Sequence, residues 1–284
     1  MRKVIFAATQ MKCDWDRKAV LDKAERTVRG AAKAGANVIL LQELFETPYF
    51  CQVQNPGYMQ LSTPLNVNPA VMLMRSLAEE LKVVIPVSFF ERYGNIGFNT
   101  IAVIDADGKI MGYYRKSHIP DGLPYAEKFY FTPGDTGFKV WDTAYGKIGV
   151  GICWDQWFPE AARIMALEGA EVLLYPTAIG SELMSDKDSK THWQNVMRGH
   201  AAANMVPVVA SNRIGIEKET GSEMSFYGGS FIADQHGEIT VLMDDVTEGF
   251  ITKEFDLDEL SVERREWGIF RDRRPELYER IMRH

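Results

Sequence analysis

Three side chains of complementary chemistry lie at the ends of short apolar segments that are far apart in the sequence. They are Glu43, Lys116 and Cys153. A thiol with the ordinary pKa of about 8.5 is mostly protonated at neutral pH, so its use as a nucleophile requires a nearby base or cation. A glutamate can act as that base, and a lysine can stabilise first a thiolate and then an oxyanion. These residue types predict an acyl-transfer site with a cysteine nucleophile, provided that the fold brings them together.

The expected resting state of such a site follows from its charges. At about 4 Å and an effective dielectric constant near 20, the Lys116 ammonium favours a Cys153 thiolate by about 4 kcal/mol, or roughly three pKa units. An ionised Glu43 opposes this effect, so we expect a proton that is shared between the thiol and the carboxylate. The backbone N–H of Trp154 is the expected second donor to the oxyanion, beside Lys116.

The residues alone leave other roles for the cysteines open. An isolated cysteine more often packs in a core than reacts, and we assign that role to Cys13 and Cys51. For Cys153, a Cys–His pair is an alternative to the glutamate and the lysine. The histidines available for it are His118, His192 and His200.

A non-hydrolytic protein that uses Cys153 as a redox-sensing thiol is a second alternative. Glu43 and Lys116 argue against it, because a redox thiol needs a cation but no general base. A dinucleotide-binding turn is not indicated either, since Trp154 occupies the place of the third glycine after Gly149-Val-Gly151.

The elements that must position these residues alternate between strands and helices. Apolar periodicity and turn residues predict strands at residues 4–10, 38–41, 83–90, 99–105, 109–114, 147–152, 171–175 and 206–211. They predict helices at residues 16–33, 69–82, 158–168 and 190–204, and three further strands before about residue 255. Such alternation indicates an α/β fold whose sheet is covered by helices, and ligands in these folds bind at the carboxyl ends of strands.

Composition indicates the class of protein and excludes some partners. The 284 residues are 46% hydrophobic, which is typical of a globular protein. The net charge of −7 creates a field that repels nucleic acids and anionic membranes. We therefore expect a small-molecule partner and no nucleic-acid or membrane partner. No segment is long enough to span a bilayer and the N-terminal apolar run is too short for a signal peptide, so a cytoplasmic protein is expected. Three widely spaced cysteines predict neither a disulfide framework nor a metal site, and we expect no cofactor.

Three short motifs carry a resemblance to a known family. They are Leu41-Gln-Glu43, Tyr114-Arg-Lys116 and Gly151-Ile-Cys-Trp-Asp155. In type and order they resemble the Glu, Lys and Cys motifs of the nitrilase superfamily of carbon-nitrogen hydrolases, and the resemblance extends over nearly the full chain. It implies that the three motif residues are, in that order, the general base, the oxyanion stabiliser and the nucleophile. It also implies that Glu127 is a second glutamate, which helps to position the lysine and the substrate.

The same resemblance implies the architecture. It predicts an α/β fold of four layers, the αββα sandwich of the nitrilase type, with residues 1–284 as a single domain. Residues from about 257 to 284 are expected to form a C-terminal arm that ends in a short helix. Because family members pack such arms across a two-fold interface, we expect a homo-oligomer built from dimers.

Within the superfamily, segments outside the three motifs resemble the branch whose members hydrolyse N-carbamoylputrescine. These segments are residues 115–121, 127–131, 152–160, 175–182 and 267–275. The resemblance implies hydrolysis of N-carbamoylputrescine to putrescine, ammonia and CO2 through a thiocarbamate on Cys153, without a metal or cofactor. N-carbamoyl-β-alanine or an ω-amide is the alternative substrate.

Three residues are predicted to bind the substrate: Trp157, Glu182 and Tyr49. Relatives that act on carbamoylated amino acids use arginines after the cysteine to hold the carboxylate, whereas this chain has Gln156 and Trp157 there. A substrate without a carboxylate is therefore expected. Its distal ammonium is costly to bury unpaired, and the acidic loop that contains Glu182 could meet it.

Overall fold

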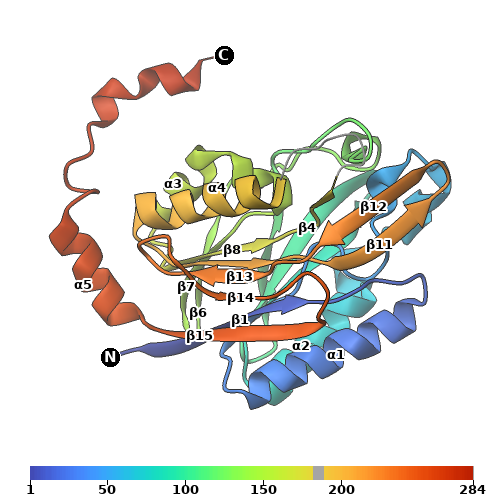
Figure 1. Ribbon diagram of the computed structural model, residues 1–284, viewed down its shortest axis with the longest axis horizontal. Helices are drawn as coiled ribbons and strands as arrows, with labels where there is room; N and C mark the ends of the chain where they lie inside the picture. The colour runs from blue at the N-terminus through green and yellow to red at the C-terminus, as the bar shows by residue number, and fades with distance from the viewer. Residues whose placement is uncertain (182–188, 284) are drawn as a thin grey trace.

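The computed structural model of the protein describes residues 1–181 and 189–283, which form four layers (Figure 1). The inner faces of two sheets pack against each other, and helices cover the two outer faces. These helices are α1 (Arg17–Lys33) and α2 (Pro69–Leu81) on one side, and α3 (Pro159–Leu167) and α4 (Ser189–Asn204) on the other. The predicted αββα sandwich is confirmed.

The first sheet has two three-stranded parts, which are joined by a parallel bridge between Val38 and Val84. The strand order is β15, β1, β2 in one part and β3, β4, β5 in the other. The bounds are β15 (Gly249–Asp256), β1 (Lys3–Gln10), β2 (Val38–Leu40), β3 (Ile85–Tyr93), β4 (Ile96–Ile104) and β5 (Ile110–Arg115). Because β2 is parallel to β1, α1 is the crossover helix of a strand-helix-strand unit.

The second sheet has six strands, in the order β14, β13, β10, β8, β7, β6. Their bounds are β14 (Ile239–Leu242), β13 (Phe231–Ala233), β10 (Val208–Ser211), β8 (Val172–Pro176), β7 (Gly146–Val150) and β6 (Val140–Thr143). The three central strands are parallel, with α3 connecting β7 to β8 and α4 following β8. A small third sheet contains β11 (Ile214–Glu219), β12 (Ser222–Tyr227) and β9 (Gly180–Ser181).

Successive side chains of a strand point in opposite directions. Both faces of the central strands are buried, because one face packs against the other sheet and the other face packs under the helices. In β1, Phe6 lies in the cluster between the sheets, whereas Ala7 packs under α1 and α2. In β8, Leu174 lies between the sheets and Leu173 packs with the α4 side. This double burial explains why uninterrupted apolar runs predicted these strands.

Helices α1 and α2 begin at capping residues that the sequence displays. Asp16 accepts a hydrogen bond from the Ala19 N–H, and Asn68 accepts one from the Val71 N–H before Pro69 opens α2. All four predicted helices agree with the observed ones to within one residue at each end. Within residues 1–181 and 189–283, no helix combines the length and the apolarity needed to cross a membrane.

The strand prediction is wrong in two respects. It omits β6 and the two-residue β9, and it places three strands after residue 211 where the structure has five. β6 is a four-residue strand at the edge of its sheet, too short to give a periodic signal. The β11–β12 hairpin carries Glu217, Lys218 and Glu223, which interrupt the apolar pattern.

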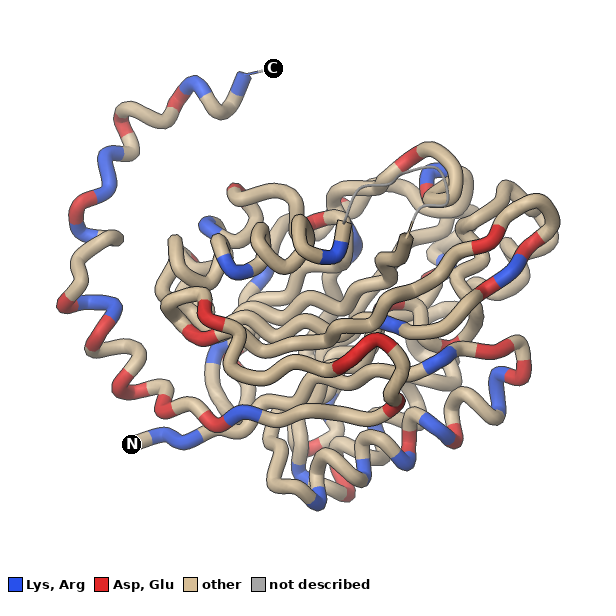
Figure 2. Tube along the Cα trace, in the orientation of Figure 1, with Lys and Arg blue, Asp and Glu red and all other residues tan. Residues whose placement is uncertain are grey.

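The C-terminal arm extends away from the four layers (Figure 1) and carries interspersed positive and negative charges (Figure 2). It starts with α5 (Leu257–Trp267) and ends with two 3-10 turns, Pro275–Leu277 and Glu279–Met282. The expected short helix at its end is therefore replaced by these turns, and α5 was not predicted. Only Leu257 and Leu260 of α5 are buried, which is too few for a periodic signal.

Candidate active site

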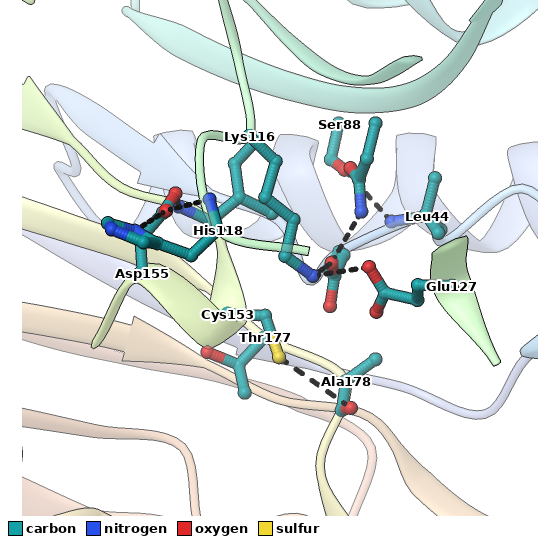
Figure 3. Close-up of polar contacts among 12 residues, drawn as sticks. Leu44, Ser88, Lys116, His118, Glu127, Cys153, Asp155, Thr177 and Ala178 are labelled. Atoms are coloured by element: carbon teal, nitrogen blue, oxygen red, sulfur yellow. Dashed lines mark hydrogen bonds and ion pairs between the residues drawn. The ribbon is translucent and has the colours of Figure 1, made fainter. Parts of the chain in front are cut away.

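The predicted catalytic residues Glu43, Lys116 and Cys153 follow strand ends and converge in space, and Figure 3 shows Lys116 and Cys153 beside Glu127. Glu43 comes after β2, Lys116 directly after β5, and Cys153 after β7. Lys116 Nζ lies 2.9 Å from Glu43 Oε1 and 2.7 Å from Glu127 Oε2. All four side chains are buried, and the most exposed of them is Cys153 at 5%. Residues that are widely separated in the sequence thus form one enclosed cluster.

Cys153 occupies a sharp turn between β7 and a 3-10 helix at Cys153–Trp157. Its φ of +42° lies in the left-handed region, which residues other than glycine rarely adopt. Just before the turn, the chain passes close to the neighbouring strand β8. Only a glycine fits there, because a Cβ on Gly151 would lie 2.8 Å from the Tyr175 ring. The Sγ points toward the Ala178 carbonyl oxygen, 3.8 Å away (Figure 3). Backbone strain of this kind is typical of a functional residue.

The backbone of Lys116 is held on both sides. Its N–H donates to the Asn99 carbonyl at 2.8 Å, and its carbonyl accepts from the Gly134 N–H at 2.8 Å. Gly134 comes so close that a Cβ there would lie 2.0 Å from the Arg115 carbonyl oxygen. The buried Arg115 is itself paired with Glu91 at 2.7 Å. The lysine therefore enters the cluster from a rigid backbone.

Glu43 is held through both its side chain and its backbone. Asn99 Nδ2 lies 2.7 Å from Oε1, the same oxygen that accepts from Lys116. The buried Arg213 donates to the carbonyl oxygens of Glu43 at 2.7 Å and of Leu44 at 3.1 Å. Glu43 Oε2 is buried and has no hydrogen-bond partner among the described residues. One carboxylate oxygen is therefore free to accept a proton.

A buried carboxylate, that of Asp155, connects the segment bearing the lysine to the segment bearing the cysteine. Its Oδ2 accepts from the Tyr114 hydroxyl at 2.7 Å and from the Ile152 N–H at 2.9 Å. Its Oδ1 accepts from the His118 N–H at 3.0 Å and lies 2.8 Å from His118 Nδ1 (Figure 3). One side chain thus fixes the two segments relative to each other.

Burial and charge set the protonation states of the cluster. Burial raises the pKa of the Cys153 thiol well above its usual value, with a further rise from Glu43 and an opposing effect of Lys116. Burial lowers the pKa of Lys116, but Glu127 and Glu43 outweigh it and hold that pKa well above its usual value. Burial also raises the pKa of Glu127, against the effect of Lys116. The lysine is shared by two carboxylates, so it does not by itself produce a thiolate, and the thiol keeps its proton at neutral pH.

Each of the three candidate histidines contacts a group other than Cys153. His118 pairs with Asp155, His200 bonds to the Gln156 carbonyl at 2.6 Å, and the His192 ring lies 4.7 Å from the Trp157 ring. The Cys–His alternative therefore has no support in this geometry. In the described part of the chain, no three His, Cys, Asp or Glu side chains form a group that could hold a metal ion.

Two of the three predicted substrate-binding residues can be located. Tyr49 is fully buried, and its hydroxyl donates to Glu127 Oε1 at 2.7 Å, so it holds that carboxylate in place. Trp157 is partly exposed, with its ring 6.2 Å from that of Trp154. Glu182 lies outside the described residues.

Gln156 anchors the cysteine turn to the second sheet and its helices. It is fully buried, and its Oε1 accepts from Trp193 Nε1 at 2.8 Å and from Thr177 Oγ1 at 3.3 Å. It therefore supplies no cation to a substrate carboxylate.

Two buried residues that hold Glu43, Asn99 and Arg213, were not predicted from the sequence. Asn99 stands within β4, among apolar residues such as Phe98 and Ile101. A polar residue inside an apolar strand was the available signal, because a buried amide needs partners. Its partners could not be identified from the sequence, since Glu43 is far away along the chain.

The arrangement is suited to acyl transfer. A buried thiol adjoins a carboxylate with one free oxygen and an ammonium that stays charged. The Trp154 N–H stands in the first turn of a 3-10 helix, where N–H groups lack intrahelical partners. The site therefore has the groups that such a reaction requires, namely a thiol, a carboxylate oxygen that can accept a proton, and N–H donors that suit an oxyanion.

Comparisons with known proteins agree with this chemistry. The family model for carbon-nitrogen hydrolases matches residues 6–265. A Solanum tuberosum protein named N-carbamoylputrescine amidase is 57% identical over 286 residues, which covers 99% of this chain and 95% of the relative. A Francisella tularensis protein named citrullinase is 53% identical over 284 residues, which covers 100% of this chain and 99% of the relative. The crystal structure of a carbon-nitrogen hydrolase from Helicobacter pylori has a TM-score of 0.94 and 37% identity and covers 99% of both chains.

Proposed function

The chain belongs to the carbon-nitrogen hydrolase family, and we propose that it hydrolyses N-carbamoylputrescine to putrescine, ammonia and CO2. It is a hydrolase of a carbon-nitrogen bond. The observation that carries the substrate assignment is the 55–57% identity, over nearly the full chain, to plant proteins named N-carbamoylputrescine amidase. The buried cluster of thiol, carboxylates and ammonium supports the reaction class.

In the first half-reaction, Cys153 attacks the ureido carbonyl carbon while Glu43 Oε2 takes the thiol proton. The carbonyl oxygen becomes an oxyanion, which accepts hydrogen bonds from Lys116 Nζ and the Trp154 N–H. The intermediate then collapses, the carbon-nitrogen bond breaks, and the proton on Glu43 passes to the departing ammonia. A thiocarbamate of the aminobutyl chain remains on the sulfur.

In the second half-reaction, Glu43 takes a proton from water, which attacks the thiocarbamate carbon. The carbon-sulfur bond breaks and the proton returns to the thiol. The released carbamate loses CO2 and gives putrescine. Glu127 and Tyr49 act by holding Lys116, since the Glu127 carboxylate bonds to both of them.

Citrulline is a second candidate substrate, because the Francisella relative named citrullinase is 53% identical over the whole chain. N-carbamoylputrescine has the structure of citrulline without its carboxylate, so both present the same ureido group. Binding citrulline requires a partner for that carboxylate. Gln156 and Trp157 stand where relatives acting on carbamoylated amino acids use arginines, and neither supplies a charge.

The experiment is a comparison of kcat/KM by ammonia release for N-carbamoylputrescine, citrulline and N-carbamoyl-β-alanine. We expect N-carbamoylputrescine to exceed citrulline by about tenfold or more, and N-carbamoyl-β-alanine to be the poorest of the three. A preference for citrulline would replace the proposed substrate, and turnover of none of them would overturn the proposal.

The distal ammonium of the substrate is assigned to Glu182, with Trp157 at the opening of the site. Glu182→Gln should raise KM for N-carbamoylputrescine with little change in kcat. Glu168→Gln, which removes an exposed carboxylate at the end of α3, is the matched control and should leave both constants unchanged. Equal KM values in the two variants would remove Glu182 from the site.

We also propose in which compartment the enzyme is found and how its chains assemble. Its three cysteines are free thiols, which fits a reducing compartment such as the cytoplasm. We place residues 1–284 in one domain, and we infer a homo-oligomer built from dimers. Exposed apolar side chains on the arm, including Leu277 at 65% and Met282 at 84%, support the assembly.

A further inference from the structure

We propose that Asn99 is a positioning residue, which selects the Glu43 oxygen that exchanges protons with Cys153 and water. Asn99 lies in β4 with a fully buried side chain. Its Nδ2 donates to Glu43 Oε1 at 2.7 Å, and its backbone carbonyl accepts from the Lys116 N–H at 2.8 Å. One residue thus contacts both the base and the segment bearing the cation. The inference rests on the proposed role of Glu43 as general base.

The two oxygens of Glu43 have different surroundings. Oε1 accepts from two donors, Asn99 Nδ2 and Lys116 Nζ, whereas Oε2 is buried and has no partner among the described residues. A proton on Oε1 would break at least one of these hydrogen bonds, and a proton on Oε2 breaks none. The proton taken from the thiol therefore goes to Oε2.

An amide suits this task because its NH2 group is a donor that cannot ionise near neutral pH. Lys116 cannot do it alone, because its ammonium also bonds to Glu127 and can turn about its long side chain. Asn99, in contrast, is a short side chain on a paired strand of the sheet. It keeps Oε1 occupied while the lysine contacts the oxyanion.

The test uses Asn99→Asp, which keeps the shape of the side chain but places a second carboxyl group against Glu43. Two adjacent carboxyls share a proton, so the acid limb of kcat/KM should move to higher pH by about one unit or more. Asn99→Ser, which adds no charge, should lower kcat about tenfold or more with little change in KM.

The matched control is Asn68→Asp. Asn68 is also fully buried and donates to a glutamate, Glu46, at 2.9 Å, but that pair is not part of the cluster. An aspartate there still caps α2 through the Val71 N–H. The control should lose stability without moving the pH profile. A folded Asn99→Asp enzyme whose acid limb coincides with that of the control would overturn the inference, as would an Asn99→Ser enzyme with normal kcat.

A second readout separates this inference from the substrate assignment. The rate at which iodoacetamide alkylates Cys153 depends on removal of the thiol proton and requires no substrate. We expect its acid limb to move in Asn99→Asp as the kcat/KM limb does. A shifted alkylation profile in an enzyme that fails to hydrolyse N-carbamoylputrescine would retain the role of Asn99 and reject the substrate. An unshifted alkylation profile would reject the role of Asn99.

Discussion

Cys153 is a buried thiol, and the nearby ammonium of Lys116 is already paired with the carboxylates of Glu43 and Glu127. Lys116 Nζ contacts Glu43 at 2.9 Å and Glu127 at 2.7 Å, so little of its charge remains for the sulfur. The resting protein therefore keeps the thiol proton, and in the proposed mechanism Glu43 removes it during attack. In that mechanism the proton that leaves the sulfur is the one that ammonia later needs, so a single carboxylate serves both steps.

A prediction about pH follows from these protonation states. The pKa of Cys153 lies well above 9.0 and that of Lys116 well above 10.5. Below these values the thiol keeps its proton and the lysine keeps its charge, and both are lost only as the pH rises through them. The plateau of kcat/KM should therefore extend to about pH 9 or higher, as measured by ammonia release on the N-carbamoylputrescine reaction. A loss of activity between pH 7 and 8.5 would instead indicate a thiolate–imidazolium pair, because the adjacent thiolate raises the pKa of the imidazolium above its usual value of about 6.5.

At the residue scale, the sequence predicted which reactive residues form the cluster but not the residues that hold them in place. Glu43, Lys116 and Cys153 could be found because each follows an apolar strand and has a reactive side chain. Asn99 and Arg213 carry no such chemistry of their own. Their roles come from contacts with residues that are distant in the sequence, and periodicity contains no information on such contacts.

At the scale of elements, the site depends on the contact between the end of β5 and the turn after β7. Asp155 makes this contact through four hydrogen-bonding groups: the Tyr114 hydroxyl and two nitrogens of His118 from the β5 side, and the Ile152 N–H from the β7 side. The strands themselves were predictable, because β5 precedes a long polar loop and the apolar β7 leads into the cysteine turn before α3. The contact was not, because β5 and β7 belong to different sheets and only the packing of the sheets brings their ends together.

We expect Tyr114→Phe to weaken this contact. The change removes the hydroxyl that donates to Asp155 Oδ2 at 2.7 Å and leaves a buried carboxylate oxygen with one donor fewer. Urea denaturation should show a loss of about 1–3 kcal/mol in the free energy of unfolding, accompanied by a lower kcat. Tyr145→Phe is the control, because its hydroxyl bonds to the Lys82 carbonyl at the surface. If both variants kept wild-type kcat, Asp155 would have no part in aligning the two segments.

At the scale of the whole molecule, the C-terminal arm packs little against the rest of the chain and leaves several apolar side chains exposed. Trp267 is 70% exposed and Ile281 is 65% exposed, on a segment that extends from the four layers (Figure 1). Apolar side chains in such a position are normally covered by another surface. The resemblance to a family predicted a dimer through this arm, whereas composition and periodicity did not predict its conformation.

Deletion of residues 268–284 should therefore change the assembly and leave the fold intact. We expect the full-length enzyme to show at least twice the 32.2 kDa mass of one chain in light scattering, and the truncated enzyme to show smaller species. The far-ultraviolet circular dichroism of the two should agree closely, because residues 268–283, the described part of the deleted segment, contain no strand or α-helix. A full-length protein that scatters as a monomer would contradict the inferred assembly.

The account as a whole rests on Cys153 as a nucleophile that carries the aminobutyl thiocarbamate after ammonia has left. The direct measurement is acid quenching of the enzyme during turnover of N-carbamoylputrescine, followed by mass spectrometry of the intact chain and its peptides. We predict an adduct with the mass of an aminobutyl carbamoyl group on the peptide that contains Cys153, formed with a burst of ammonia and absent from Cys153→Ala. Turnover of N-carbamoylputrescine by Cys153→Ala, or an adduct located on another residue, would contradict the account.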